Sequence, residues 1–140
     1  MNKNLIYIFI FLSISYLSAT DMVLDPSFQF NYTSTDIDAS SDSIGSFNGT
    51  IYNVSSNMIT LAVVRNINEL SEGWTSSICV GSTCYNELVD SVSVDINSLD
   101  SISCGILAWT NGTGDGLVQL NLFDHNSPAD NIVVDINFYF

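Results

Sequence analysis

The chain has 140 residues, with 15 acidic side chains against two basic ones and a formal net charge of −13 at pH 7. A surface this acidic repels phosphate backbones and anionic membranes, which excludes nucleic acid as an expected partner. The length suits one domain with a real core and is too short for two.

The first 20 residues differ from everything that follows. Lys3 precedes an almost wholly apolar run from Leu5 to Leu17, and small residues lead up to Asp21. This pattern is typical of a secretory signal peptide, and its apolar run is shorter than the roughly 20 residues that a membrane-spanning helix needs. We therefore expect a signal peptide over residues 1–20, one domain over residues 21–140 and no membrane span after cleavage. A retained membrane anchor is the alternative.

Strands are predicted along the rest of the chain, because β-branched and aromatic residues alternate with Ser, Thr, Asn and Asp over short segments. Residues 35–43 are expected to form a polar loop, and residues 55–57 a turn that pairs the flanking strands as a hairpin. Residues 66–73 are expected to be a connection. The predicted strands of this first half are Phe28–Thr33, Ser46–Val54 and Met58–Arg65.

The middle of the chain contains two of its three cysteines. Gly81 and Ser82 form a turn signal between Cys79 and Cys84, so the chain can double back and bring the two sulfurs within bonding range. A disulfide that closes so small a loop contributes only about 2 kcal/mol, which makes fixing the local shape its expected role. Cys104 is expected to be free and buried, with an intermolecular disulfide or lipid attachment as the alternatives.

The second half continues the alternating pattern. Residues 111–116 form a glycine-rich turn that is predicted to pair the strands on either side of it as a hairpin, and residues 124–131 form a loop. The predicted strands here are Val92–Asn97, Ile102–Thr110, Leu117–Phe123 and Ile132–Phe140.

Seven or eight short strands separated by turn signals predict an all-β fold, a two-sheet antiparallel β-sandwich of the immunoglobulin or fibronectin III type. A closed barrel is the alternative. We expect Trp74 and Trp109 to anchor the core or to pack beside the Cys79–Cys84 disulfide, because each lies next to alternating apolar residues.

The segments Gly73-Trp74, Ser77-Ile78-Cys79, Cys84-Tyr85 and Asp90-Ser91 resemble a pattern in small immunoglobulin-like modules of bacterial secreted and cell-surface proteins, in which a glycine-tryptophan pair precedes a short cysteine pair. The likeness covers about residues 51–140. It implies an extracellular β-sandwich without catalytic residues, often one module of a longer surface protein. Ser71-Glu72 stand where that pattern has a proline, and Leu99-Asp100-Ser101 replace a Pro-Gly-like turn.

Calcium is the metal that the residues suggest, since hard cations take oxygen ligands and Asp124, Asn126 and Asp130 cluster in one loop, with Asn131 and Asp115 as further candidates. The alternative is that Asp and Asn occupy turns for backbone reasons. A zinc set of Cys79, Cys84, Cys104 and His125 is weaker, because secretion favours oxidised cysteines. We therefore expect no cofactor, with calcium as the alternative.

Catalysis is not expected. The chain has a single histidine and carries no nucleophile elbow or phosphate-binding loop. Glu69 and Glu72 could form a glycosidase carboxylate pair only in a deep cleft, which so small a sandwich rarely has. Candidate glycosylation acceptors in sequons are Asn31, Asn48, Asn53 and Asn111.

The function expected from these features is that of a secreted, non-enzymatic binding or adhesion module at a cell surface, with another protein or a surface glycan as partner. The alternative is a structural subunit of an extracellular filament or surface layer. Such a subunit would assemble by strand addition at an open sheet edge, with residues 20–32 as the donated strand.

Overall fold

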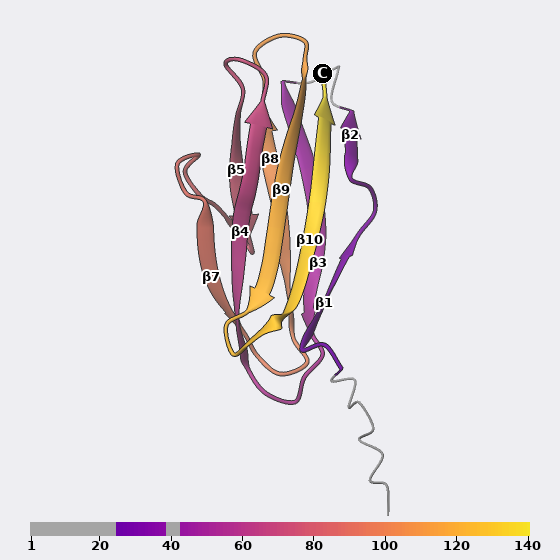
Figure 1. The fold of residues 1–140 in the computed structure, drawn as a ribbon, viewed down its shortest axis with the longest axis vertical. Coiled ribbons are helices and arrows are strands. Elements are labelled where there is room, and N and C mark those ends of the chain that lie inside the picture. The colour runs from indigo at the N-terminus through magenta and orange to yellow at the C-terminus, as the bar shows by residue number, and fades with distance from the viewer. Residues whose placement is uncertain (1–24, 39–42) are drawn as a thin grey trace, which may run out of the picture.

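The computed structural model describes residues 25–38 and 43–140, which form a β-sandwich of ten strands (Figure 1). The predicted signal peptide, residues 1–20, lies outside the described residues. Within the described part, no helix is long and apolar enough to cross a membrane. The strands are β1 (Phe28–Tyr32), β2 (Asp36–Asp38), β3 (Ile44–Asn53), β4 (Ile59–Leu70), β5 (Thr75–Val80), β6 (Thr83–Cys84), β7 (Ser91–Ile96), β8 (Ser101–Trp109), β9 (Asp115–Asp124) and β10 (Ser127–Tyr139).

The strands form two sheets, which confirms the predicted two-sheet sandwich. Sheet A has the order β1-β3-β8-β5-β6, and sheet B has the order β2-β10-β9-β4-β7. The prediction of a wholly antiparallel fold is wrong at β2, which pairs with β10 in parallel. The N-terminal segment first runs antiparallel to β3 in sheet A and then continues to the edge of sheet B, where its direction matches that of β10. Residues 35–43, predicted as a loop, therefore contain an edge strand.

Both hairpins predicted from turn signals are wrong. β3 pairs with β1 and β8 in sheet A, whereas β4 pairs with β7 and β9 in sheet B. Likewise β8 lies between β3 and β5, whereas β9 lies between β4 and β10. The turns at residues 54–58 and 110–114 thus carry the chain from one sheet to the other. Alternation of apolar residues marks the face that a strand buries. Both sheets bury one face against the same core, so the alternation is the same whether a turn forms a hairpin within one sheet or carries the chain to the other sheet.

Strand β4 is longer than predicted. Residues 66–70, expected to be a connection, continue the strand and pair with β9 after a register shift between Arg65 and Ile67. Such a bulge displaces the alternation of side chains by one residue. The apolar pattern is interrupted by Asn66 at the bulge and by Asn68 and Glu69 beyond it, although the backbone remains in the sheet.

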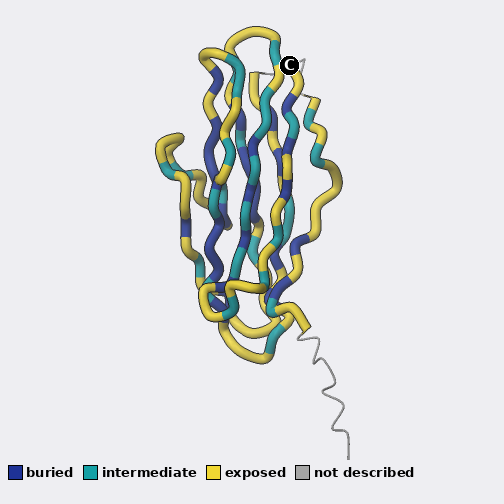
Figure 2. Tube along the Cα trace, in the orientation of Figure 1, coloured by how far each residue is buried: buried dark blue, intermediate teal, exposed yellow. Residues whose placement is uncertain are grey.

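The core lies between the two sheets, where the buried positions alternate along the strands (Figure 2). Trp74 is buried, as predicted, and its ring packs edge-to-face on Phe140 with centroids 4.6 Å apart. The core position predicted for Trp109 is wrong, because its side chain is 37% exposed. Ile106 and Ala108 of β8 point into the core, so Trp109 points to the outer face. The largest fully buried side chains are Phe28, Phe47, Phe138, Ile51, Leu61, Ile78, Ile106, Leu120, Leu122, Ile136, Val63 and Val118.

The two sheets differ in charge. The strands of sheet A, as the structure describes them, contain no charged residue. The strands of sheet B contain Arg65 and the acidic residues Asp36, Asp38, Glu69, Asp95, Asp115, Asp124, Asp130 and Asp135. The acidity of the chain is therefore concentrated on one half of the sandwich and on the loops.

Candidate binding surfaces

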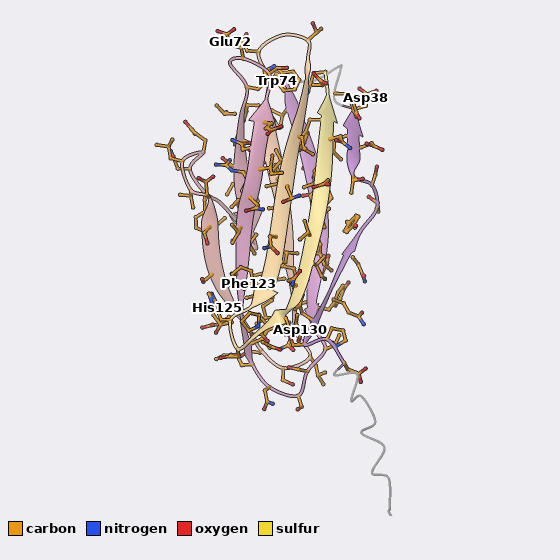
Figure 3. The ribbon with its side chains drawn as sticks, in the orientation of Figure 1. Asp38, Glu72, Trp74, Phe123, His125 and Asp130 are labelled. Atoms are coloured by element: carbon orange, nitrogen blue, oxygen red, sulfur yellow. A yellow bond between two sulfur atoms is a disulfide. The ribbon has the colours of Figure 1, made fainter. Side chains whose placement is uncertain are left out.

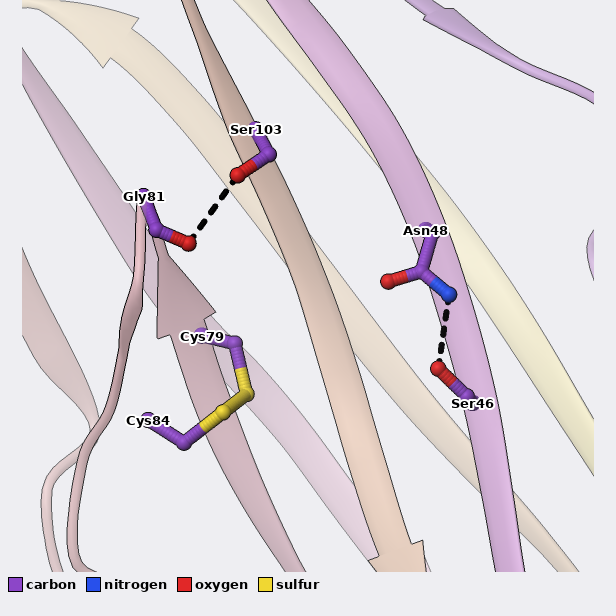
Figure 4. Close-up of a disulfide and its surroundings, with 6 residues drawn as sticks. All are labelled: Ser46, Asn48, Cys79, Gly81, Cys84 and Ser103. Atoms are coloured by element: carbon purple, nitrogen blue, oxygen red, sulfur yellow. Dashed lines mark hydrogen bonds between the residues drawn. A yellow bond between two sulfur atoms is a disulfide. The ribbon is translucent and has the colours of Figure 1, made fainter.

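The disulfide predicted between Cys79 and Cys84 is present, and it joins directly opposed residues of β5 and β6 at one edge of sheet A (Figure 4). The turn between these strands needs Gly81, whose φ of 61° lies in the left-handed region that favours glycine. The Gly81 N–H donates to the Ser103 carbonyl at 2.9 Å, and the Ser103 hydroxyl donates to the Gly81 carbonyl at 3.0 Å. The corner is therefore tied to the central strand β8.

Cys104 is free and buried, as predicted. Burial removes its sulfur from water and raises the pKa of the thiol to about 12. The thiol therefore stays protonated and unreactive at neutral pH while the chain is folded.

Thiol titration tests this arrangement. At pH 8 we expect no reaction with a thiol reagent in the folded protein, one thiol after unfolding in denaturant, and three after unfolding with a reductant, because the disulfide masks two of the chain's three cysteines. Rapid labelling of the folded protein, or three thiols without reductant, would contradict it.

Arg65 is the centre of a hydrogen-bonded clamp that the sequence analysis did not identify. Its side chain is buried, and Nε and Nη2 donate to Oδ1 of Asp90 at 2.9 and 2.6 Å. Nη2 also donates to the Glu87 carbonyl at 2.6 Å. Nη1 donates to the carbonyl and hydroxyl oxygens of Ser76 on β5. One guanidinium thus joins sheet B, sheet A and the loop that precedes β7.

That loop, residues 85–90, is here called the clamped loop, and it leads into β7 at the side of the sandwich (Figure 1). The backbone N–H groups of Leu88 and Val89 donate to the side chain and the carbonyl of Asn86, both at 2.9 Å. Tyr85 and Val89 pack against the core. Leu88, in contrast, is 85% exposed, the largest value among the exposed large hydrophobic side chains of the described residues. The loop holds an apolar side chain in water on a fixed backbone.

Asn53 joins two turns, the one that precedes β4 at residues 54–58 and the one that follows β7 at residues 97–100. Its buried amide donates from Nδ2 to the carbonyls of Asn57 at 2.7 Å and of Ile96 and Asn97 at 2.9 Å. A glycan on Nδ2 would replace one of its two N–H donors and would need room that this buried amide lacks, which disfavours Asn53 as an acceptor in the folded chain, and its glycosylation stays a prediction. The other candidate acceptors, Asn31, Asn48 and Asn111, are exposed, and their glycosylation stays a prediction.

Two carboxylates among the calcium candidates, Asp124 and Asp130, accept hydrogen bonds from the backbone. Asp124 is buried and accepts the Asn126 N–H at 2.9 Å, and Asp130 accepts the Ser27 N–H at 3.2 Å, so both carboxylates serve backbone groups. No group of three or more His, Cys, Asp or Glu side chains is placed to hold a metal ion in the part of the chain that is described. Calcium binding stays a prediction.

The four residues of the proposed zinc set are in different chemical environments. Cys79 and Cys84 are joined in the disulfide, so they are not thiolates. Cys104 is buried. His125 lies beside Phe123 with ring centroids 5.5 Å apart, and its Nε2 is 3.2 Å from the Ser93 hydroxyl (Figure 3).

Of the two carboxylates proposed for a glycosidase pair, one lines a hollow. Glu69 lines a shallow hollow of about 660 Å³ on the outer face of sheet B, together with Asp115 and Tyr139, whereas Glu72 is not part of that lining. Figure 3 shows Glu72 at the upper end of the sandwich and Asp130 at the lower end. A second hollow of about 430 Å³ lies between β1 and the start of β10.

Solved structures share this architecture. The N-terminal domain of PorA superposes with a TM-score of 0.57 and 21% identity, covering 79% of this chain and 88% of that one. The CooA pilin subunit from enterotoxigenic Escherichia coli gives a TM-score of 0.51 and 12% identity, over 81% of this chain and 98% of that one. The fold is an immunoglobulin-like β-sandwich. At these identities the likeness is one of fold alone.

No protein-family model and no curated protein sequence matches the chain. The resemblance of the Gly73-Trp74 and cysteine-pair pattern to bacterial surface modules therefore stays a prediction, although the cysteine pair and the sandwich that it implied are present.

Proposed function

We propose that the chain is a non-enzymatic extracellular or cell-surface module that binds another protein through the clamped loop. The observation that carries the proposal is the exposure of Leu88 on a loop that the buried Arg65 holds in place. The side chain of Leu88 adds nothing to the core. Removing a guanidinium from water is costly, and the fold uses this one to order the segment that presents Leu88.

A loop that is ordered before binding loses little conformational entropy when a partner docks. Glu87 and Asp90 flank Leu88 and are exposed, and the whole chain is strongly acidic. The partner that fits is a protein with an apolar pocket for Leu88 and basic side chains around it, because such charges complement the acidic rim and speed encounter.

An extracellular location is supported by the disulfide, since disulfides persist in oxidising compartments. It is also supported by the signal peptide expected over residues 1–20.

The test is retention at the surface of the cells that produce the protein. Leu88→Ser should reduce the amount held on washed cells by about tenfold and increase the amount in the medium, because burying a leucine side chain in a partner contributes roughly 1.5–3 kcal/mol and each 1.4 kcal/mol is a factor of ten in affinity. Leu99→Ser is the matched control, as Leu99 is 77% exposed on a different turn. It should behave like the wild type, and both variants should keep the wild-type melting temperature. Equal retention of all three proteins would reject the proposal.

The alternative function, a subunit that polymerises by strand addition, is favoured by the edge strand β7. In the pairing of β4 with β7, the Arg65 N–H donates to the Asp90 carbonyl. Hydrogen-bonded and non-hydrogen-bonded pairs alternate in an antiparallel sheet, so the backbone N–H and C=O groups of Ser91, Ser93 and Asp95 point away from β4. Asp95 is the one charged residue of this edge. The donated strand predicted over residues 20–32 is less favoured, because Phe28 and Phe30 are buried in the chain's own core.

Ser93→Pro separates the two functions. Proline at this position removes an outward N–H without breaking a bond to β4. Polymers of the wild type that disappear in Ser93→Pro would support the structural subunit. A wild type that forms no open-ended polymer at any concentration would support the binding module.

A further inference from the structure

The outer face of sheet A, here called the uncharged face, differs from every other broad surface of the described sandwich. Its side chains are hydroxyls, amides and apolar groups, and none of its strands has a charge. The pairing register places its side chains in rows across three strands. The outward residues are Ile44, Ser46, Asn48, Thr50 and Tyr52 on β3, Ser101, Ser103, Leu107 and Trp109 on β8, and Thr75 and Cys79 on β5, whereas the outward position Ser77 is buried.

One end of this face is apolar. Ile44 lies directly opposite Trp109, and Leu107 lies in the next row, opposite Ser46. Ile44 is 46% and Trp109 37% exposed. The outward positions of an antiparallel sheet that faces water are normally polar. Aromatic and aliphatic side chains on a surface depleted of charge are instead the composition of the centre of a protein–protein interface.

Side chains in the middle of the face are held by hydrogen bonds (Figure 4), beside a hollow of about 380 Å³ whose lining includes Asn48, Thr50 and Ser103. Gly105 has no side chain there, and a Cβ at this position would lie 2.2 Å from the Phe47 carbonyl oxygen. The Asn48 amide donates to the Ser46 hydroxyl at 2.6 Å, and the Ser103 hydroxyl is bonded to Gly81. A surface fixed in this way docks with little loss of side-chain entropy.

We propose that the uncharged face binds a second copy of the chain in an isologous two-fold dimer. The charge distribution selects this occupant. Each copy carries a net charge of −13, so contact through sheet B would place acidic residues of both copies against each other, at a cost of several kcal/mol. The uncharged face is the surface at which two identical copies meet without that cost. When both copies use the same patch, the contact is complete in a dimer and leaves no free patch for a polymer to grow.

This dimer goes beyond the proposed function, because the clamped loop is not part of the uncharged face. It would present two copies of Leu88, which raises the avidity of the module for a surface that carries several partners.

The experiment is sedimentation velocity over a range of concentrations. The secreted chain is produced without N-glycosylation, because Asn31 and Asn48 both lie on sheet A. Ile44→Glu places a carboxylate in the apolar row of both copies, and it should raise the dimer dissociation constant by about 100-fold. Val133→Glu is the matched control, since Val133 is a β-branched side chain, 52% exposed, on strand β10 of sheet B. It should change the constant by less than about twofold.

Ionic strength gives an independent readout. The remaining long-range repulsion between two acidic copies is screened by salt, so the dimer should tighten as sodium chloride rises from about 0.05 to 0.5 M. A second variant, Trp109→Ser, should weaken the dimer without adding charge, and near-ultraviolet circular dichroism should confirm that each variant is folded.

Three results would overturn the proposal. One is a wild type that stays monomeric at about 100 μM in high salt, where an interface of this kind should be populated. Another is a dimer that Val133→Glu weakens as much as Ile44→Glu does. The last is an open-ended polymer that Ser93→Pro abolishes, which would assign self-association to the edge of β7.

Discussion

Replacing Arg65 by Ala is expected to lower the free energy of unfolding by about 4 kcal/mol, because two buried polar groups lose their donor, at roughly 1–3 kcal/mol each, and a large side chain is removed from between the sheets. The guanidinium contacts Ser76, Glu87 and Asp90. Its loss leaves the buried carbonyl and hydroxyl of Ser76 without this donor and opens a cavity between the sheets. Chemical denaturation followed by tryptophan fluorescence measures the change.

Asp90→Asn is the control for this experiment. The Asp90 side chain is 67% exposed, so its charge is screened by water and its removal should cost less than about 1 kcal/mol. If Asp90→Asn costs as much as Arg65→Ala, the ion pair, and not the bonds to the buried backbone, holds the loop. If neither variant is destabilised, the clamp contributes nothing.

Replacing Asn53 by Ala is expected to cost about 3 kcal/mol, because the buried Ile96 carbonyl left without a donor costs roughly 1–3 kcal/mol and the two part-buried carbonyls lose a donor as well. The amide serves three carbonyls, those of Asn57, Ile96 and Asn97. Asn53→Asp should be at least as destabilising, because a carboxylate of the same shape accepts hydrogen bonds and cannot donate them.

Asn48→Ala is the matched control, since Asn48 lies on the same strand and donates only to the exposed Ser46 hydroxyl. Its cost should stay within about 0.5 kcal/mol, the range of surface substitutions. A small effect of Asn53→Ala would show that the turns at residues 54–58 and 97–100 hold together without it, and would reopen Asn53 as a glycan acceptor.

Local signals in the sequence were sufficient for the class of fold and for the corner at Cys79 and Cys84. Alternation of apolar residues is a property of single strands, and a turn with Gly81 between two nearby cysteines is a property of one segment. Both were predicted correctly for that reason. The pairing of strands is not local. A turn such as that at residues 110–114 has the same composition whether the chain returns to the same sheet or crosses to the other.

The features that mattered most for function were also non-local. Arg65 was visible as a lone basic residue at the end of an apolar segment, but its partners lie 11 to 25 residues away on other elements. Asn53 was assigned to glycosylation because its sequon is local, whereas its bonds to Ile96 and Asn97 span 43 and 44 residues. Trp109 was placed in the core because its neighbours are apolar, although alternation along β8, counted from Ile106, places it outside.

The parallel pairing of β2 with β10 has a consequence for how the protein is made. Asn137 donates to Asp36 at 3.0 Å across 101 residues of chain, and the neighbouring strands β3 and β8, or β4 and β9, are also distant in sequence. Contacts of this range form slowly, because the entropy of closing long loops must be lost before any pairing stabilises the chain. Sheet B is incomplete until the last residues of β10 have been synthesised. The complete sandwich can therefore form only after the strand that pairs with β2 at one end of the chain has been added at the other.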